Sequence, residues 1–85
     1  MERMTIQVAD GRYTLPDTEE AEAVQRLARY ENLHESVLKE QAECAAKLEA
    51  LRGDGKEKTV KFRELLARKL TGSQVLALLQ AHGLE

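Results

Sequence analysis

The sequence is 85 residues long and carries 15 acidic and 13 basic side chains, so its net charge is only −2. A chain of this length forms one small domain at most, and oligomerisation is a common way for so small a core to gain stability. The single cysteine excludes an internal disulfide and favours a reducing, cytoplasmic setting. The sequence contains no apolar run of bilayer-spanning length and no signal-peptide core, so we expect no membrane segment.

The residue pattern predicts a mainly α-helical, α+β fold in a single domain, residues 1–85. One long amphipathic helix follows an N-terminal β-hairpin, and two shorter C-terminal helices fold back on it. The expected elements are the hairpin over 3–15, the long helix over 18–52, a linker over 53–55, a helix over 56–70 and a short helix over 73–82.

The hairpin is predicted from its turn. Asp10-Gly11 is typical of a type I′ turn, which requires positive φ at both central residues. Such a turn would place Val8 opposite Tyr13 and Ile6 opposite Leu15, with all four side chains on one face. Because a lone hairpin is marginally stable in water, this face is expected to cover either the first turns of the long helix or a second hairpin from a partner chain.

The long helix is predicted from the spacing of its apolar residues. From Ala23 to Leu51, residues four and three positions apart fall on one helical face, and no Gly or Pro interrupts the run. Asp17 followed by Glu20 resembles a capping box, and Gly53-Asp54-Gly55 is expected to end the helix. The resulting stripe consists of Ala23, Leu27, Tyr30, His34, Val37, Gln41, Cys44, Leu48 and Leu51.

Two shorter helices are predicted after the linker. Thr59 either caps the first of them or begins an extended segment that reaches Phe62. Thr71-Gly72-Ser73 is expected to break the helical pattern, with Ser73 capping the last helix. Laid end to end, the two helices reach roughly 36 Å, whereas the long helix is roughly 52 Å long. Part of the stripe is therefore expected to have no partner within the chain.

Covering that stripe with a second copy predicts a homo-oligomer, most simply a dimer, with either parallel or antiparallel helices. Its function would be that of a non-enzymatic protein–protein interaction or structural module. His34 and Gln41 lie one heptad apart on the stripe, where they either form a polar layer that sets register or lie at a wet margin. The expected oligomer interface is Leu27, Tyr30, His34, Val37, Gln41, Cys44 and Leu48.

The sequence predicts no catalytic residues, no cofactor and no metal. Glu31 and His34 match the Glu-x-x-His element of carboxylate di-metal bundles, but the stripe lacks the further inward glutamates that such a site needs. Cys44 lies roughly 15 Å along the helix from His34, too far for a nucleophile–base pair within one chain. We interpret Cys44 as a small buried thiol.

Nucleic-acid binding is the alternative function. Residues 52–71 carry seven basic and three acidic side chains, whereas residues 1–51 have a net charge of −5, and phosphate contacts supply most non-specific affinity. The run from Leu66 to Ser73 resembles a helix-turn-helix, although its recognition helix would offer no Arg, Lys or Asn. The other interpretation is a solvated face, or a face that pairs with an acidic neighbour. The candidate contacts are Lys58, Lys61, Arg63, Arg68 and Lys69.

Two stretches resemble small uncharacterised proteins of bacterial phages and integrated mobile elements. They are Arg26-Leu27-Ala28-Arg29-Tyr30-Glu31 and the run from Lys58 to Leu66, Lys-Thr-Val-Lys-Phe-Arg-Glu-Leu-Leu. The resemblance implies a mobile-element origin and an accessory or structural role. The resemblance implies no active site.

Overall fold

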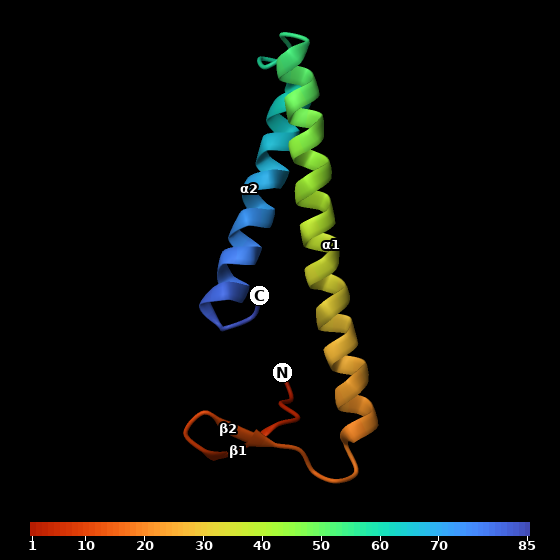
Figure 1. Ribbon diagram of the computed structural model, residues 1–85, viewed down its shortest axis with the longest axis vertical. Coiled ribbons are helices and arrows are strands. Elements are labelled where there is room, and N and C mark those ends of the chain that lie inside the picture. Colours follow the sequence, from red (N-terminus) through yellow and green to blue (C-terminus); the bar gives the residue numbers. More distant parts are fainter. The chain divides into compact units, whose positions relative to one another are not determined.

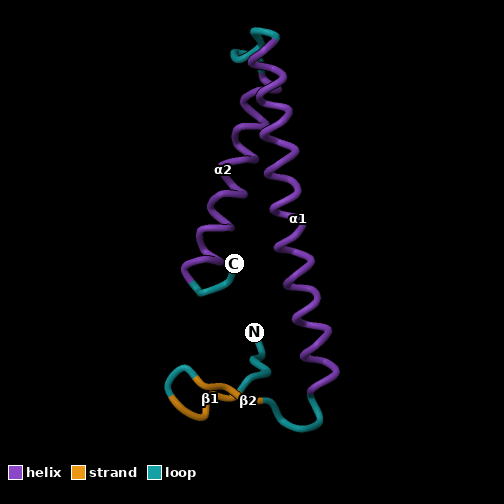
Figure 2. Tube along the Cα trace, viewed as in Figure 1, coloured by secondary structure: helices purple, strands orange, loops and turns teal.

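The computed structural model describes residues 1–85, which fall into two compact units, Met1–Asn32 and Leu33–Glu85. Its regular elements are the strands β1 (Ile6–Ala9) and β2 (Arg12–Thr14) and the helices α1 (Glu20–Gly53) and α2 (Val60–Ala81) (Figures 1 and 2). The chain is mainly helical with an N-terminal β-hairpin, as predicted. The prediction of three helices is wrong, because a single helix, α2, occupies the region where two were expected.

The hairpin of the first unit is antiparallel, but its register differs from the prediction. Gly11 has a φ of 70° and Asp10 has no positive φ, so this is not the type I′ turn, which needs both. The ladder shifts by one residue between Gln7 and Ala9, as at a β-bulge. The observed pairs are Ile6 with Thr14, Gln7 with Tyr13 and Ala9 with Arg12, so the predicted pairs of Val8 with Tyr13 and Ile6 with Leu15 are wrong.

Helix α1 begins at Glu20, two residues later than predicted. A turn precedes it, in which the Glu19 amide donates to the Pro16 carbonyl at 3.0 Å. The helix ends where the glycines predict. Gly55, with a φ of 69°, donates to the Arg52 carbonyl at 3.0 Å, and the next amide donates to the Leu51 carbonyl at 2.8 Å. This pair of bonds is a Schellman motif, which satisfies the last carbonyls of a helix.

Thr59 is the N-cap of α2, one of the two alternatives that the sequence left open. Its backbone is extended and its side-chain oxygen accepts a hydrogen bond from the Phe62 amide at 3.2 Å. At the other end Gly83, with a φ of 81°, donates to the Gln80 carbonyl at 2.9 Å, and Leu84 donates to the Leu79 carbonyl at 2.8 Å. Both helices of the second unit therefore end in the same glycine-dependent motif.

The predicted break at Thr71-Gly72-Ser73 does not form because its polar groups find partners that are compatible with a helix. The Thr71 hydroxyl donates to the Ala67 carbonyl one turn earlier at 3.1 Å. The Ser73 hydroxyl accepts from the side-chain amide of Gln41 on α1 at 3.0 Å. A glycine inside a helix costs only about 1 kcal/mol, which packing against α1 can offset.

The core of the second unit lies near the loop that joins the two helices. Four side chains are buried, Cys44 and Leu48 from α1 and Phe62 and Leu65 from α2, and Leu51 packs against them. In the view of Figure 1 the two helices are closest at this loop and separate toward the C-terminal end of α2. Burial follows the same trend, since His34 and Val37 of α1 and Leu76 and Leu79 of α2, which lie farther from the loop, are only half-buried.

Candidate interaction surfaces

Helices α1 and α2 of the second unit meet along a seam with regular spacing. In both helices the less exposed residues alternate between three and four positions apart, as in helices that pack side by side in bundles. The seam residues are His34, Val37, Gln41, Cys44, Leu48 and Leu51 on α1, and Phe62, Leu65, Lys69, Gly72, Leu76 and Leu79 on α2.

A polar contact crosses the middle of the seam. The side-chain amide nitrogen of Gln41 donates to the Lys69 carbonyl and to the Ser73 hydroxyl, both at 3.0 Å. Gly72 leaves room for this amide, because a Cβ at position 72 would lie 2.7 Å from the Gln41 Cδ. The polar residue Gln41 therefore makes its hydrogen bonds across the seam within one chain.

An open groove of about 510 Å³ runs along one side of this seam. Its lining residues come from both helices, and most of them directly precede a seam residue in the sequence. Glu40 on α1 and Glu64 and Arg68 on α2 give the groove a mixed charge. The full lining is Val37, Glu40, Gln41, Glu64, Ala67, Arg68, Thr71, Gly72 and Val75.

The residues predicted to form an oligomer interface differ in how much of each the chain itself covers. Helix α2 covers Cys44 and Leu48 within the chain, at 3% and 2% exposure. Val37 is half-buried and lines the groove. In the first unit Tyr30 is half-buried and Leu27 is 57% exposed. The end of the predicted stripe nearest the loop is therefore an intrachain contact.

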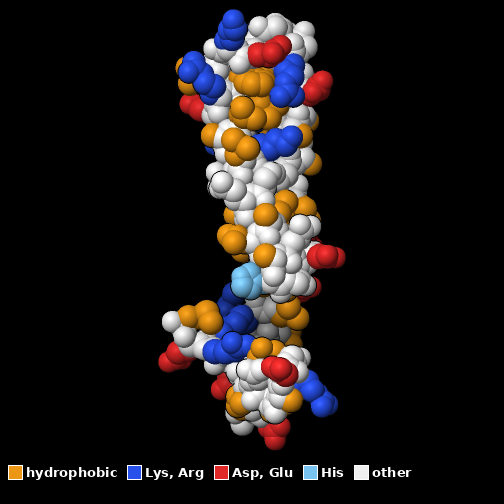
Figure 3. All heavy atoms as spheres, turned by 90° about the vertical axis from the view of Figure 1, so that its left-hand side faces the viewer, with side chains coloured by type: hydrophobic (Ala, Val, Ile, Leu, Met, Phe, Trp, Pro, Cys, Tyr) orange, Lys and Arg blue, Asp and Glu red, His pale blue; other side chains and the backbone are white.

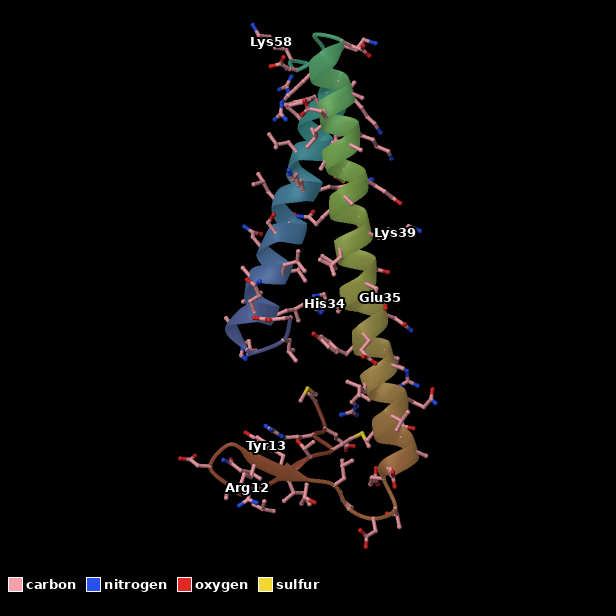
Figure 4. The ribbon with its side chains drawn as sticks, viewed as in Figure 1. Arg12, Tyr13, His34, Glu35, Lys39 and Lys58 are labelled. Carbon is pink, nitrogen blue, oxygen red and sulfur yellow. The ribbon has the colours of Figure 1, made fainter.

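His34 lies at the end of the seam farthest from the loop and is half-buried. Figure 4 shows its ring on the side of α1 that faces α2, whereas Lys39 points to the opposite side. Glu31, the other half of the Glu-x-x-His match, is exposed. No group of three or more His, Cys, Asp or Glu side chains is arranged to hold a metal ion.

The basic side chains proposed for nucleic-acid contact are divided among different surfaces. Lys58 lies in the loop before α2 (Figure 4). Lys61 and Arg68 precede seam residues, Arg63 follows one, and Lys69 is a half-buried seam residue. Helical geometry therefore places them on both sides of the seam and within it.

The continuous helix α2 also excludes the helix-turn-helix that the run from Leu66 to Ser73 resembled. Residues 66–75 contain no turn, so the segment has no separate recognition helix, and that interpretation is wrong.

Near the loop, the Arg52 guanidinium has two neighbours within the chain. It lies 5.3 Å from the Phe62 ring centroid and 3.6 Å from Glu49. Figure 3 shows hydrophobic side chains framed by Lys and Arg over this end of the helices.

The first unit carries its own exposed apolar side chains. Ile6, Val8 and Tyr13 of the hairpin are all more than half exposed. The guanidinium of Arg3 stacks 4.9 Å from the Tyr13 ring centroid, and Arg26 of α1 donates to the Glu2 carbonyl at 3.0 Å. Neither arginine contact is predictable from the sequence, because both involve the irregular N-terminal segment, which has no periodic pattern.

A second group of exposed residues lies on the side of the seam opposite the groove. All of its members are apolar, and each directly follows a seam residue. Leu38, Leu66 and Leu70 are 51%, 37% and 58% exposed. The feature that groups them is the unbroken spacing of α2 through Gly72, which sets the seam and hence its two sides. We call this group the apolar flank; it consists of Leu38, Ala42, Ala45, Leu66, Leu70 and Ala77.

Comparison with known proteins finds no matching protein family, no matching curated protein and no matching solved structure. Neither helix combines the length and the apolar character needed to cross a bilayer.

Proposed function

We propose that this protein is a non-enzymatic association module that pairs with a second copy of itself through its helices. The observation that carries the proposal is the imbalance between buried and exposed apolar side chains. Four hydrophobic residues are buried, whereas thirteen large hydrophobic side chains are exposed. Single exposed apolar residues are normal, but a helical surface that carries several of them at regular spacing is typical of an interface.

The experiment that tests this proposal is thermal unfolding, followed by circular dichroism at several protein concentrations. If the native state is a dimer and the unfolded chain is a monomer, Tm rises with protein concentration by mass action. We expect a rise over a hundredfold range of concentration. A Tm that stays constant over that range would contradict self-association.

The proposal includes two expectations from the sequence. A cytoplasmic setting is supported by the single cysteine, Cys44, which is free and buried. A mobile-element origin is supported by the resemblance of the segments at 26–31 and 58–66. Both fit a small accessory protein that acts by contact rather than by chemistry.

We do not propose nucleic-acid binding as the function. Its motif depended on a turn at 71–73 that the continuous helix α2 replaces, and its basic residues are divided between the sides of the seam. A fluorescence titration of labelled duplex DNA at low salt is the direct test. Binding that weakens steeply with salt and with Lys58, Lys61 and Arg63 replaced would favour this alternative.

A further inference from the structure

The two sides of the seam differ in chemical character. Six of the twelve residues that directly precede seam positions are charged; Glu40, Lys61 and Arg68 are examples, whereas Leu33 and Leu78 at the open end are apolar. Residues that directly follow seam positions in the middle of both helices are apolar apart from Ser73, and the apolar ones form the flank. Near its ends this second side becomes polar, with Glu35 and Gln80 farthest from the loop and Glu49, Arg52 and Arg63 nearest to it.

The structure shows that residues from both helices share each side. The groove contains Glu40 of α1 together with Arg68 and Val75 of α2, all of which precede seam residues. The two helices run in opposite directions and face each other. The residue that directly follows a seam residue therefore points toward the same side of the helix pair on both helices. The residues that follow seam positions, among them Leu38 and Leu66, therefore share the side opposite the groove.

A helix with one apolar seam has one neighbour, whereas a wider apolar face indicates a bundle with a further neighbour. The flank widens the apolar face of both helices in this way. Its apolar centre with a polar rim is also the usual anatomy of a protein interface. The second unit has only 53 residues, and cores of that size commonly gain stability from a partner.

The charge distribution along the second unit indicates which partner fits and in which direction. Residues 44–69, around the loop, carry eight basic and four acidic side chains, for a net charge of +4. Residues 33–43 and 70–82, at the open end, carry one basic and three acidic side chains, for a net charge of −2. A second copy with its loop at the opposite end brings unlike charges together, whereas a copy in the same direction brings +4 against +4.

We infer that a second copy docks antiparallel on the apolar flank, so that two helical hairpins form a four-helix bundle with two-fold symmetry. This inference rests on the proposed self-association and adds its surface and its direction. Each flank meets the same flank of the partner, as a two-fold interface requires. The groove on the other side, with Gln41 and Gly72 at its floor, stays open to solvent.

The first part of the test compares two double variants by light scattering after size exclusion. Leu38→Gln with Leu70→Gln alters the flank. Leu33→Gln with Leu78→Gln is the matched control, because these leucines are 53% and 64% exposed and directly precede seam residues. We expect about 9.6 kDa for the flank variant and about 19 kDa, twice the chain mass, for the control and the wild type.

Each outcome of this comparison has a distinct meaning. If the wild type is a dimer and the flank variant is also a dimer, the inference is overturned while self-association stands. If both variants are monomers, association does not depend on the side of the seam, and the inference is again overturned. If the wild type is a monomer, both the proposed function and the inference fail.

The second part measures direction in a folded chain. Copies with Glu35→Cys and copies with Glu49→Cys, both in a Cys44→Ala background, are mixed and oxidised gently, and the disulfide-linked pairs are separated by mass. Two-fold symmetry places α1 on the partner's α1, so the antiparallel arrangement predicts that links between 35 and 49 predominate over links between identical positions. Predominance of links between identical positions would overturn the antiparallel bundle. Ala46→Cys, on the face of α1 away from the seam, is the control for random collision.

Discussion

The two halves of the helical hairpin share one spacing but differ in how well they pack. Near the loop, Leu48 of α1 and Phe62 and Leu65 of α2 are buried against each other. Toward the open end, the same spacing brings His34 to the seam on α1 and Leu76 to the seam on α2, and both stay half-buried. Spacing thus decides which residues face the other helix, whereas the size and polarity of those residues decide how completely they are buried there.

The largest expected effect tests this difference between the halves directly. Leu48→Ala removes a side chain that is 2% exposed, and such core truncations cost about 2–5 kcal/mol. Leu76→Ala, at the half-buried end, should cost less than half as much because fewer contacts are lost. Urea unfolding followed by circular dichroism measures both. Equal losses for the two variants would mean that the halves are packed alike.

The middle of the seam, between the two halves, is tested by a double-mutant cycle. Gly72→Ala in a Gln41→Ala background should stabilise the chain by up to about 1 kcal/mol through helix propensity. In the wild type the new Cβ would displace the Gln41 amide from its bonds, so the gain should vanish or reverse, with a coupling of about 1–2 kcal/mol. Additive effects in the same urea assay would remove the proposed role of Gln41 in setting the register.

The glycines at the loop provide a matched pair of substitutions. Gly55 has a φ of 69°, whereas Gly53 lies within α1, and neither has neighbours that a Cβ would meet. Gly55→Ala should cost about 1–2 kcal/mol because L-residues are strained in this conformation. Gly53→Ala should be neutral or stabilising by up to about 1 kcal/mol. The midpoint of thermal unfolding reports both, and a larger loss at position 53 would contradict this account of the helix end.

The smallest effect is expected at the start of α2, beside the well-packed half. Thr59→Ala removes the side-chain oxygen that accepts from the Phe62 amide, which typically costs about 1 kcal/mol. Thr59→Ser keeps that acceptor and should retain most of the stability. If the serine variant unfolds as early as the alanine variant, the cap contributes through something other than its hydroxyl oxygen.

Local signals in the sequence predicted the hairpin and α1, whereas contacts between elements were needed to define the hairpin register and the single helix α2. Asp10-Gly11 predicted the hairpin, but the register depended on a backbone conformation at Asp10 that residue types do not determine. The uninterrupted spacing before Gly53 predicted α1 to within two residues. The supposed break at Thr71-Gly72-Ser73 failed because Gln41, thirty residues earlier, supplies the partner that makes a helix favourable there.

The candidate surface was predictable only in part, for the same reason. The seam residues of α1 follow from periodicity, but nothing in α1 alone indicates that α2 covers Cys44 and Leu48. Leu38 and Leu70 lie on the same side of the helix pair, as members of the apolar flank, only because both helices are continuous and antiparallel. Once the break between the last two predicted helices is removed, the spacing of α2 places them on one side.

The most direct test of the central claim is the mass of the wild-type chain in solution, measured by light scattering across a wide range of concentration. The account predicts about 19 kDa at high concentration, twice the 9.6 kDa of one chain, with a fall toward the monomer mass on dilution. A mass of 9.6 kDa at every concentration would contradict it. The apolar flank would then be a surface that the protein keeps exposed to solvent.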